Sequence, residues 1–187
     1  GTPLLLLTVS YLSQPQYPLG PDTEQTIVAA SHALTEAILV LSDSLTPTRS
    51  QAIQYSIQSI SQRAFILAPL TFCSKHNQHE ASHALATLIA TIVTEEIDQL
   101  ITQPADSLLP LLLQIQAHPR IPVAITVLEV WLTVQDVPTR DRHEHWKVPL
   151  FQQLMHVLLR RLAYPSTQFT TWDEEFELEE QHFMEFR

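Results

Sequence analysis

The stretch from His79 to Ile101 reads HEASHALATLIATIVTEEIDQLI and carries the longest uninterrupted helical pattern in the chain. Its apolar residues recur every three or four positions, which is the spacing of one face of an α-helix. They are Leu85, Leu88, Ile89, Ile92, Val93, Ile97, Leu100 and Ile101. The pattern predicts a single amphipathic helix that runs unbroken to Ile101 and is ended by Pro104.

Comparable helical patterns lie on both sides of this stretch. Asp22-Thr23-Glu24-Gln25 resembles a capping box, and Pro47, Pro122 and Pro149 stand near the starts of further helices. The predicted helices cover residues 22–41, 47–64, 79–101, 108–117, 122–136, 149–162 and 172–187. The faces expected to be buried near the C-terminal side are Val123, Val127, Val130, Trp131 and Val134, and then Leu150, Phe151, Leu154, Met155, Leu158, Leu159 and Leu162.

The composition agrees with an all-α fold. Hydrophobic residues make up 45% of the chain, which is enough for a core and argues against general disorder. Glycine accounts for only 2 of the 187 residues, while 13 are proline. Rossmann domains, phosphate-binding loops and β-barrels need glycine where φ is positive, so the composition argues against all three. No convincing stretch alternates with the period of two that is typical of strands.

The charge and the cysteine content limit the partners and the compartment. The net charge is −10, from 20 acidic and 10 basic residues. Direct binding to nucleic acid needs clustered lysine and arginine, so we expect none. Cys73 is the single cysteine, which excludes an internal disulfide and favours a reducing compartment. The apolar run 4–7 is too short to cross a bilayer, so we expect a soluble intracellular protein without a membrane partner.

The spacing of the helices predicts a repeat architecture. The pairs 106–117 with 122–136, and 147–163 with 173–187, recur at about 40 residues, which is the period of HEAT and armadillo units. A single pair cannot bury its apolar faces, so neighbouring pairs must stack on it. We therefore expect an α-α superhelix of antiparallel helix pairs, with approximate units 1–45, 46–104, 105–138 and 144–187, that is part of a longer solenoid.

Several short motifs follow one another in an informative order. They are LLPLLL at 108–113, AHP at 117–119, VLEVWLT at 127–133, VPLFQQL at 148–154, LLRR at 158–161 and YP at 164–165, before an acidic helix that ends at Phe186-Arg187. In this order and spacing, residues 80–187 resemble importin-β-type nuclear transport receptors (karyopherins), in particular the transportin-SR and importin-thirteen branch. Val130 departs from that pattern, because the family often has an aromatic residue before this tryptophan.

The resemblance implies an interior HEAT-repeat fragment of a receptor several times longer. Such receptors shuttle between cytoplasm and nucleus through the nuclear pore, and bind cargo, the GTPase Ran and Phe-Gly repeat nucleoporins. The resemblance therefore implies a docking protein that is not an enzyme and needs no cofactor. It assigns no Ran contact to an individual residue of this chain. A helical-repeat scaffold unrelated to nuclear transport remains a further alternative.

A zinc-dependent metallopeptidase is the alternative from another class. His79-Glu80-Ala81-Ser82-His83 matches the H-E-x-x-H pattern, in which two histidines on one helix face hold zinc and the glutamate acts as base. Under this hypothesis His79 and His83 are the metal ligands and Glu80 is the base. The sequence offers no recognised third ligand downstream, so we expect no metal site and treat the histidines as surface or interhelical residues. His76 could add a third imidazole to the same face if the helix extends that far.

Acidic residues concentrate at the C-terminal end, where seven of the 20 acids lie in 173–187. The candidate protein-binding residues there are Asp173, Glu174, Glu175, Glu177, Glu179 and Glu180, which could attract a basic cargo or a basic patch of a GTPase. Trp131 is expected in the core, because it lies on a helical stripe. The segment 143–146, which includes Trp146, is expected at the surface.

Overall fold

The computed structural model describes residues 21–42, 79–104 and 108–162. Every regular element in these ranges is helical, and the ranges contain no β-strand. The expected all-α class is therefore confirmed for this part of the chain. The predicted helices at 47–64 and 172–187 lie outside the described residues.

Six α-helical segments and three short 3-10 turns follow α2 in these ranges. The longer helices are α2 (Pro21–Ser42), α5 (His79–Glu95), α7 (Leu108–Gln116), α9 (Leu128–Asp136) and α10 (Val148–Leu162). The short elements are α6 (Ile97–Leu100), α8 (Ile121–Ala124), η1 (Ile125–Val127), η2 (Thr139–Asp141) and η3 (Glu144–Trp146).

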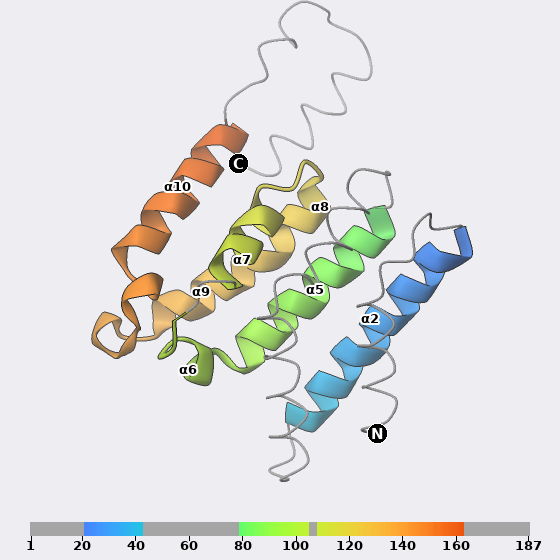
Figure 1. Ribbon diagram of the computed structural model, residues 1–187, viewed down its shortest axis with the longest axis horizontal. Helices are drawn as coiled ribbons and strands as arrows, with labels where there is room; N and C mark the ends of the chain where they lie inside the picture. The colour runs from blue at the N-terminus through green and yellow to red at the C-terminus, as the bar shows by residue number, and fades with distance from the viewer. Residues whose placement is uncertain (1–20, 43–78, 105–107, 163–187) are drawn as a thin grey trace, which may run out of the picture.

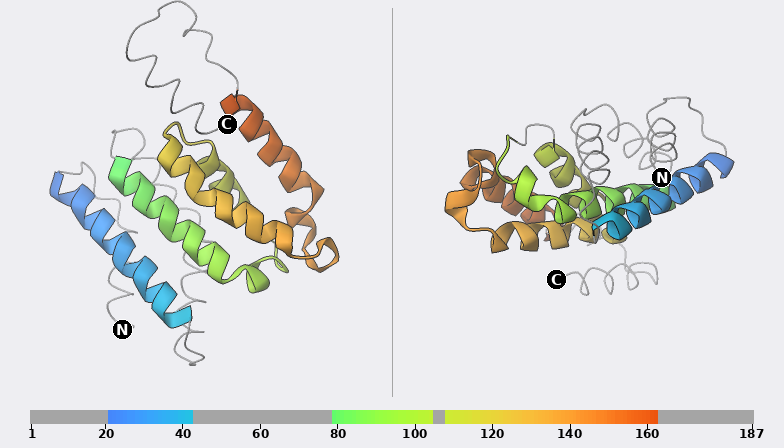
Figure 2. Two further views of the ribbon diagram at one scale, coloured as in Figure 1. Left: turned by 180° about the vertical axis from the view of Figure 1, so that it is seen from behind. Right: turned by 90° about the horizontal axis from the view of Figure 1, so that it is seen from below.

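The helices form a layered packing. α2, α5 and the continuous run α8–η1–α9 lie side by side and point in the same direction (Figure 1). α7 runs antiparallel to α8–α9 and lies on one side of that row, as the edge-on view in Figure 2 shows. α10 returns antiparallel to α9 and packs against α7. Each sequence-adjacent pair of long helices from α7 onward is therefore antiparallel, as short connections require.

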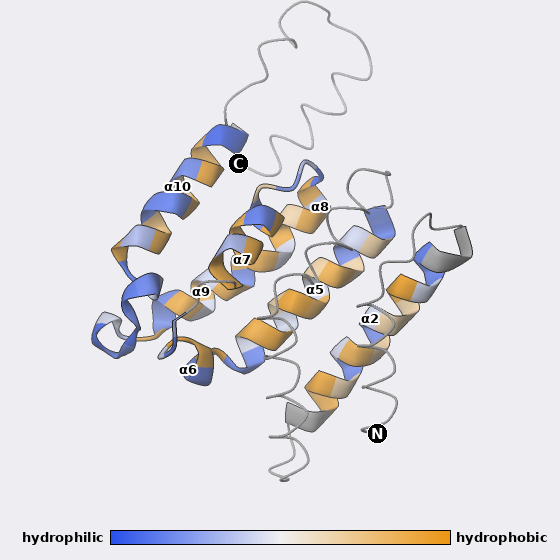
Figure 3. Cartoon of the chain, in the orientation of Figure 1, coloured by the Kyte–Doolittle hydropathy of each residue, from blue (hydrophilic) through white to orange (hydrophobic). Residues whose placement is uncertain are grey.

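α5 forms the centre of the core. Ten of its 17 residues are buried, because it is covered by α2 on one side and by α8, η1 and α9 on the other. α2 contributes Ile27, Leu34 and Ile38, all of them buried. Apolar residues accordingly dominate α5 in Figure 3. Burying one Leu or Ile side chain is worth about 1.5–3 kcal/mol, so this doubly covered helix is a main source of stability.

The helix that begins at His79 does not continue unbroken to Ile101, contrary to the prediction. It ends at Glu95, and Glu96 leaves the helical conformation with φ −114° and ψ 18° before the short helix α6. The change of direction, visible in Figure 1, keeps Ile97, Leu100 and Ile101 all buried. The prediction that these apolar residues are buried is correct. However, a spacing of three or four residues does not reveal a one-residue break between two helices.

The predicted helix 122–136 is helical throughout but changes type along its length. It starts at Ile121, one residue before Pro122, and passes through the 3-10 turn η1. The predicted inner face is confirmed, because every one of its members is buried. They are Val123, Val127, Val130, Trp131 and Val134.

Trp146 lies in the core, so its expected surface position was wrong. The side chain is completely buried, and its indole Nε1 donates a 3.2 Å hydrogen bond to the backbone carbonyl of Gln103. Nearby, the backbone N–H of His143 donates to the carbonyl of Ile101 at 2.8 Å. These two contacts attach the polar connection 137–147 to the end of the α5–α6 unit. The sequence pattern missed this because the residues flanking Trp146 are charged or polar.

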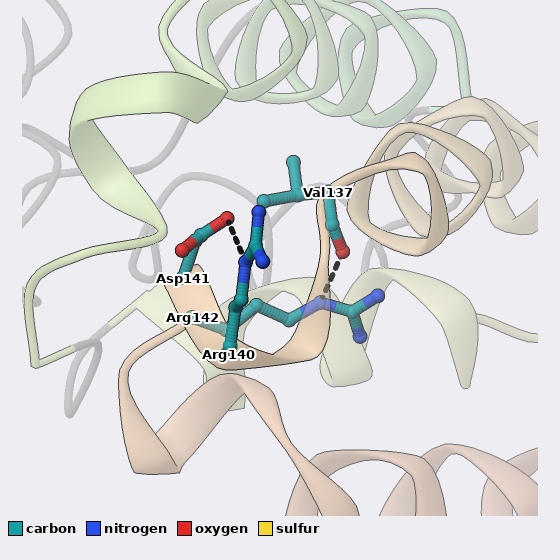
Figure 4. A network of polar contacts seen from close by, with 4 residues as sticks. All are labelled: Val137, Arg140, Asp141 and Arg142. Carbon is teal, nitrogen blue, oxygen red and sulfur yellow. Dashed lines mark hydrogen bonds and ion pairs between the residues drawn. The ribbon is translucent and has the colours of Figure 1, made fainter.

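Arg142 fastens the same connection to the end of α9. Its Nε donates to the carbonyl of Val137 at 2.8 Å, as Figure 4 shows, and its Nη2 donates to the carbonyl of Gln135 at 3.1 Å. Its guanidinium also lies 5.7 Å from the centroid of the Phe151 ring on α10. Neighbouring Arg140 instead pairs with Asp141 in solvent. Arg142 therefore links the C-terminal carbonyls of α9 to α10.

The apolar face of α10 is only partly inside the protein. Leu150 and Leu154 are buried, and Phe151 and Leu158 pack at the edge of the core. Met155 and Leu159 are each 57% exposed, so their predicted burial was wrong. The described helices cover one side of the apolar arc and leave the other side open.

Candidate functional site

An exposed apolar row lies on the outer side of the α8–η1–α9 run. Ile125, Leu128 and Leu132 are 44%, 39% and 55% exposed, and their spacing of three and four residues places them on one face. The opposite face, from Val123 to Val134, is buried. We call Ile125, Leu128 and Leu132 the 125–132 row. The helix is therefore apolar on two sides, although the described core uses only one.

A second exposed apolar row runs along α10. It consists of Val148, Met155 and Leu159, spaced by seven and four residues, and each is more than half exposed. The last turn of α10 adds Arg160 and Arg161. Large exposed apolar side chains in a row, rather than singly, are typical of surfaces that contact another protein segment. The sequence had placed Met155 and Leu159 in the core, so this surface was missed.

The structure places the H-E-x-x-H motif in the first turns of α5. His79 is half-buried, whereas Glu80 and His83 are exposed. The Nε2 atom of His79 lies 2.8 Å from Nη2 of Arg120, in the connection between α7 and α8. The other ring nitrogen, Nδ1, is buried. A zinc ion at Nε2 would therefore compete with a guanidinium, which is itself a cation.

Among the described residues, no third ligand lies with these histidines. Within residues 21–42, 79–104 and 108–162, no group of three or more His, Cys, Asp or Glu side chains is arranged to hold a metal. Glu95 ends α5, more than three turns from the motif, and Glu96 is buried at the break. His79 thus contacts an arginine, and the peptidase alternative stays a prediction. His76 lies outside the described residues.

The acidic candidates at the C-terminal end lie outside the described residues. They are Asp173, Glu174, Glu175, Glu177, Glu179 and Glu180. Their role in binding a basic partner stays a prediction. Trp131, by contrast, is confirmed as a core residue: it is 4% exposed and donates from Nε1 to the side chain of Gln116.

The sequence analysis includes His118 and Arg161 only within the motifs 117–119 and 158–161, and it does not predict that they lie beside Arg120. The backbone N–H of Arg120 donates to Nδ1 of His118 at 3.1 Å, and Nη1 of Arg161 donates to the carbonyl of His118. Burial lowers the pKa of the His118 imidazole below 6.5, with smaller contributions from the charges of His79, Arg161 and Arg120. The sequence signal for this contact was the polar turn His118-Pro119-Arg120 between two predicted helices, because polar side chains in such a turn can contact a neighbouring helix.

Within the described part of the chain, none of the helices combines the length and the apolarity that crossing a membrane requires. No known family model matches this sequence, and no curated protein matches it significantly.

Proposed function

We propose that this chain is a protein-binding segment of an α-solenoid, and that the parent protein is an importin-β-type nuclear transport receptor. The observation that carries the proposal is the 125–132 row. It is an apolar surface on a helix whose other face is already fully used in the core. A surface of this kind has no structural role within the described helices and suits an apolar side chain of a partner.

The arrangement of the helices supports a repeat protein. α2, α5 and α8–α9 lie in one row and run in the same direction, as corresponding helices of successive repeats would (Figure 2). α7 and α10 pack against each other beside that row. In a stack of this kind each unit contacts only its neighbours, so its curvature can change at a small cost per unit.

The motifs that carry the resemblance fall on separate elements of this arrangement. LLPLLL forms the first two turns of α7, VLEVWLT crosses from η1 into α9, and VPLFQQL opens α10. The tryptophan of the second motif, Trp131, faces the core, while Leu128 and Leu132 of the same motif face outward. The motif thus combines a packing role with an exposed surface.

The proposed mechanism is docking without chemistry. Phenylalanine side chains of Phe-Gly repeats would insert against the 125–132 row. Cargo and GTP-loaded Ran would bind elsewhere on the stack. Binding of one would change the curvature of the stack and so weaken binding of the other. Because each apolar contact is small and exposed, binding to one repeat should be weak and rapidly reversible. Affinity would come from many such contacts along the receptor.

Retention on an immobilised Phe-Gly repeat peptide tests the proposal. We expect the chain to be retained, and the double variant Leu128→Ser, Leu132→Ser to bind at least about tenfold more weakly, because each leucine loses buried apolar area. Gln153→Ser on the exposed surface of α10 is the control and should bind as the parent does. GTP-loaded and GDP-loaded Ran are tested on the same chain.

The outcomes separate the candidate functions. Retention that is equal in the parent and the double variant would reject the 125–132 row as the docking surface. Absence of binding to both the Phe-Gly peptide and Ran would reject the nuclear-transport assignment and favour a helical-repeat scaffold of another pathway. Stoichiometric zinc in untagged protein, lost together with hydrolytic activity in His83→Ala, would instead favour the peptidase.

A further inference from the structure

One side of α10 is left uncovered by the helices that the structure describes. Its exposed apolar residues are Val148, Met155 and Leu159, which are 65%, 57% and 57% exposed. Gln152 is also exposed and lies between Val148 and Met155 on the same face of the helix. We call these four residues the 148–159 row. Read from its C-terminal end, the row presents two apolar residues, one polar residue and a third apolar residue, at intervals of four, three and four positions.

The same order of residue types occurs in the segment that follows α10. Trp172, Phe176, Glu179 and Phe183 also follow one another at intervals of four, three and four positions. The sequence predicts a helix over 172–187, and a helix with this spacing carries all four side chains on one face. These residues lie outside the described ranges, and the helix is a prediction from their sequence.

An antiparallel arrangement of the two helices brings the four positions into register. It places Leu159 opposite Trp172, Met155 opposite Phe176, Gln152 opposite Glu179, and Val148 opposite Phe183. Three of these pairs are apolar, and in the fourth the amide N–H of a glutamine can donate to a carboxylate. The nine residues 163–171 separate the end of α10 from the predicted helix, and short connections of this kind favour the antiparallel direction.

The charges beside the two faces are complementary. His156 and Arg160 each come directly after a member of the row on α10, and both are exposed. In the segment 172–187, Asp173 and Glu177 each come directly after an aromatic member of the matching pattern. Two helices that face each other in opposite directions place these positions at the same edge of their interface. Arg160 then lies beside Asp173 and His156 beside Glu177, as flanking charges do between paired helices.

We infer that the segment 172–187 of this chain packs antiparallel on α10 and covers the 148–159 row in this register. The helix spacing alone predicts that 147–163 and 173–187 form a pair, but it gives the pair neither a face nor a register. The exposed row supplies both. The adjoining segment has the matching order of residues and the opposite charge, which favours it over a second copy of the chain as the occupant of this surface.

This packing divides the acidic candidates into two groups. Asp173 and Glu177 lie beside α10, where they pair with its basic side chains and are not available to a partner. Glu174 follows Trp172 by two positions, which turns it by about 200° to the opposite side of the helix. A basic partner therefore meets the outer acids of the segment, and the inner acids hold the segment in place.

Disulfide cross-linking in the full chain tests the inference. The chain used carries Cys73→Ser, so each variant contains only its two introduced cysteines. We expect Met155→Cys with Phe176→Cys, and Val148→Cys with Phe183→Cys, to form a disulfide within one chain under oxidised glutathione. The control, Met155→Cys with Phe183→Cys, displaces the partner by about 10 Å along the helix. It should cross-link at least about tenfold more slowly, because a disulfide needs Cα atoms within about 7 Å.

The flanking charges provide a second measurement. Arg160→Glu, added to the pair at 155 and 176, places two acids at the same edge and should slow its cross-linking about twofold. Asp173→Arg, added to that variant, should restore the rate. The disulfides are followed on non-reducing gels over a range of protein concentrations, and circular dichroism checks that each variant retains its helices.

Three results would overturn the inference. The first is that the two pairs in register cross-link no faster than the control. The second is that the disulfides join two chains, as a second copy on the 148–159 row would require. The third is that Arg160→Glu leaves the rate unchanged, or that Asp173→Arg does not reverse its effect.

Discussion

The indole of Trp131 and the side-chain amide of Gln116 form a buried hydrogen bond across the antiparallel helices α7 and α9, with 2.9 Å between Nε1 and Oε1. Gln116 is completely buried and Trp131 nearly so. A polar pair in this position fixes how the two helices align along their axes, because a shift along either axis would leave a donor and an acceptor unsatisfied.

We predict that the two residues are energetically coupled. Trp131→Phe leaves the Gln116 oxygen without its donor, and Gln116→Leu leaves the indole N–H without its acceptor, so each should lower the free energy of unfolding by about 1–3 kcal/mol. The double variant should lose at least about 0.5 kcal/mol less than the sum of the single variants. Urea unfolding followed by far-UV circular dichroism measures this, and additive losses would contradict the coupling.

A second prediction concerns Trp146, which anchors the connection 137–147. Trp146→Ala removes a fully buried indole and should cost about 3–5 kcal/mol. Trp146→Phe retains much of the apolar area but loses the hydrogen bond to the Gln103 carbonyl, so a smaller loss of about 1–2 kcal/mol is expected. The same unfolding measurement distinguishes them. A Trp146→Ala variant as stable as the parent would show that the side chain behaves as a surface residue.

The sequence was sufficient where a residue's role follows from local spacing. The valines from Val123 to Val134 repeat with the helical period, and the buried face they form was predicted correctly. The sequence was insufficient where the role of a residue depends on contacts with residues far away in the sequence. The buried Trp146 donates to the carbonyl of Gln103, 43 residues earlier, and no local pattern around Trp146 encodes that contact.

The same limit applies to the candidate sites. The exposure of Met155 and Leu159 depends on which helices cover α10, and the spacing within α10 is the same for a covered and an uncovered face. Hydrogen bonds connect His79, His118, Arg120 and Arg161, although His79 and Arg161 are 82 positions apart in the sequence. The H-E-x-x-H pattern predicts a metal as the partner of His79, whereas the partner in the structure is Arg120.

A third prediction compares two nearby arginines. Arg142 donates to two carbonyls at the end of α9 and lies over Phe151, so Arg142→Ala should lower the free energy of unfolding by about 1–2 kcal/mol. Arg140→Ala removes only an exposed pair with Asp141 and should leave the unfolding midpoint unchanged. Equal effects of the two substitutions, measured by urea unfolding, would show that the contacts at the end of α9 contribute nothing.

The last prediction is a dependence of stability on pH that arises from His118. Burial holds the pKa of its imidazole in the folded chain below the unfolded value of 6.5, because the charged ring is costly to desolvate and lies near Arg161 and Arg120. As the pH falls, the unfolded chain therefore binds this proton first, and protonation favours unfolding. The stability that depends on a neutral His118 is fully present above about pH 6.5 and is lost as the pH falls through the folded-state pKa.

His118→Asn cannot titrate but preserves an acceptor for the Arg120 N–H, so its unfolding free energy should fall less steeply between pH 7.5 and pH 5. Denaturant titrations of both proteins across this range, in a buffer without phosphate, measure the difference in slope. Parallel curves for the parent and His118→Asn would mean that His118 takes up no additional proton on unfolding.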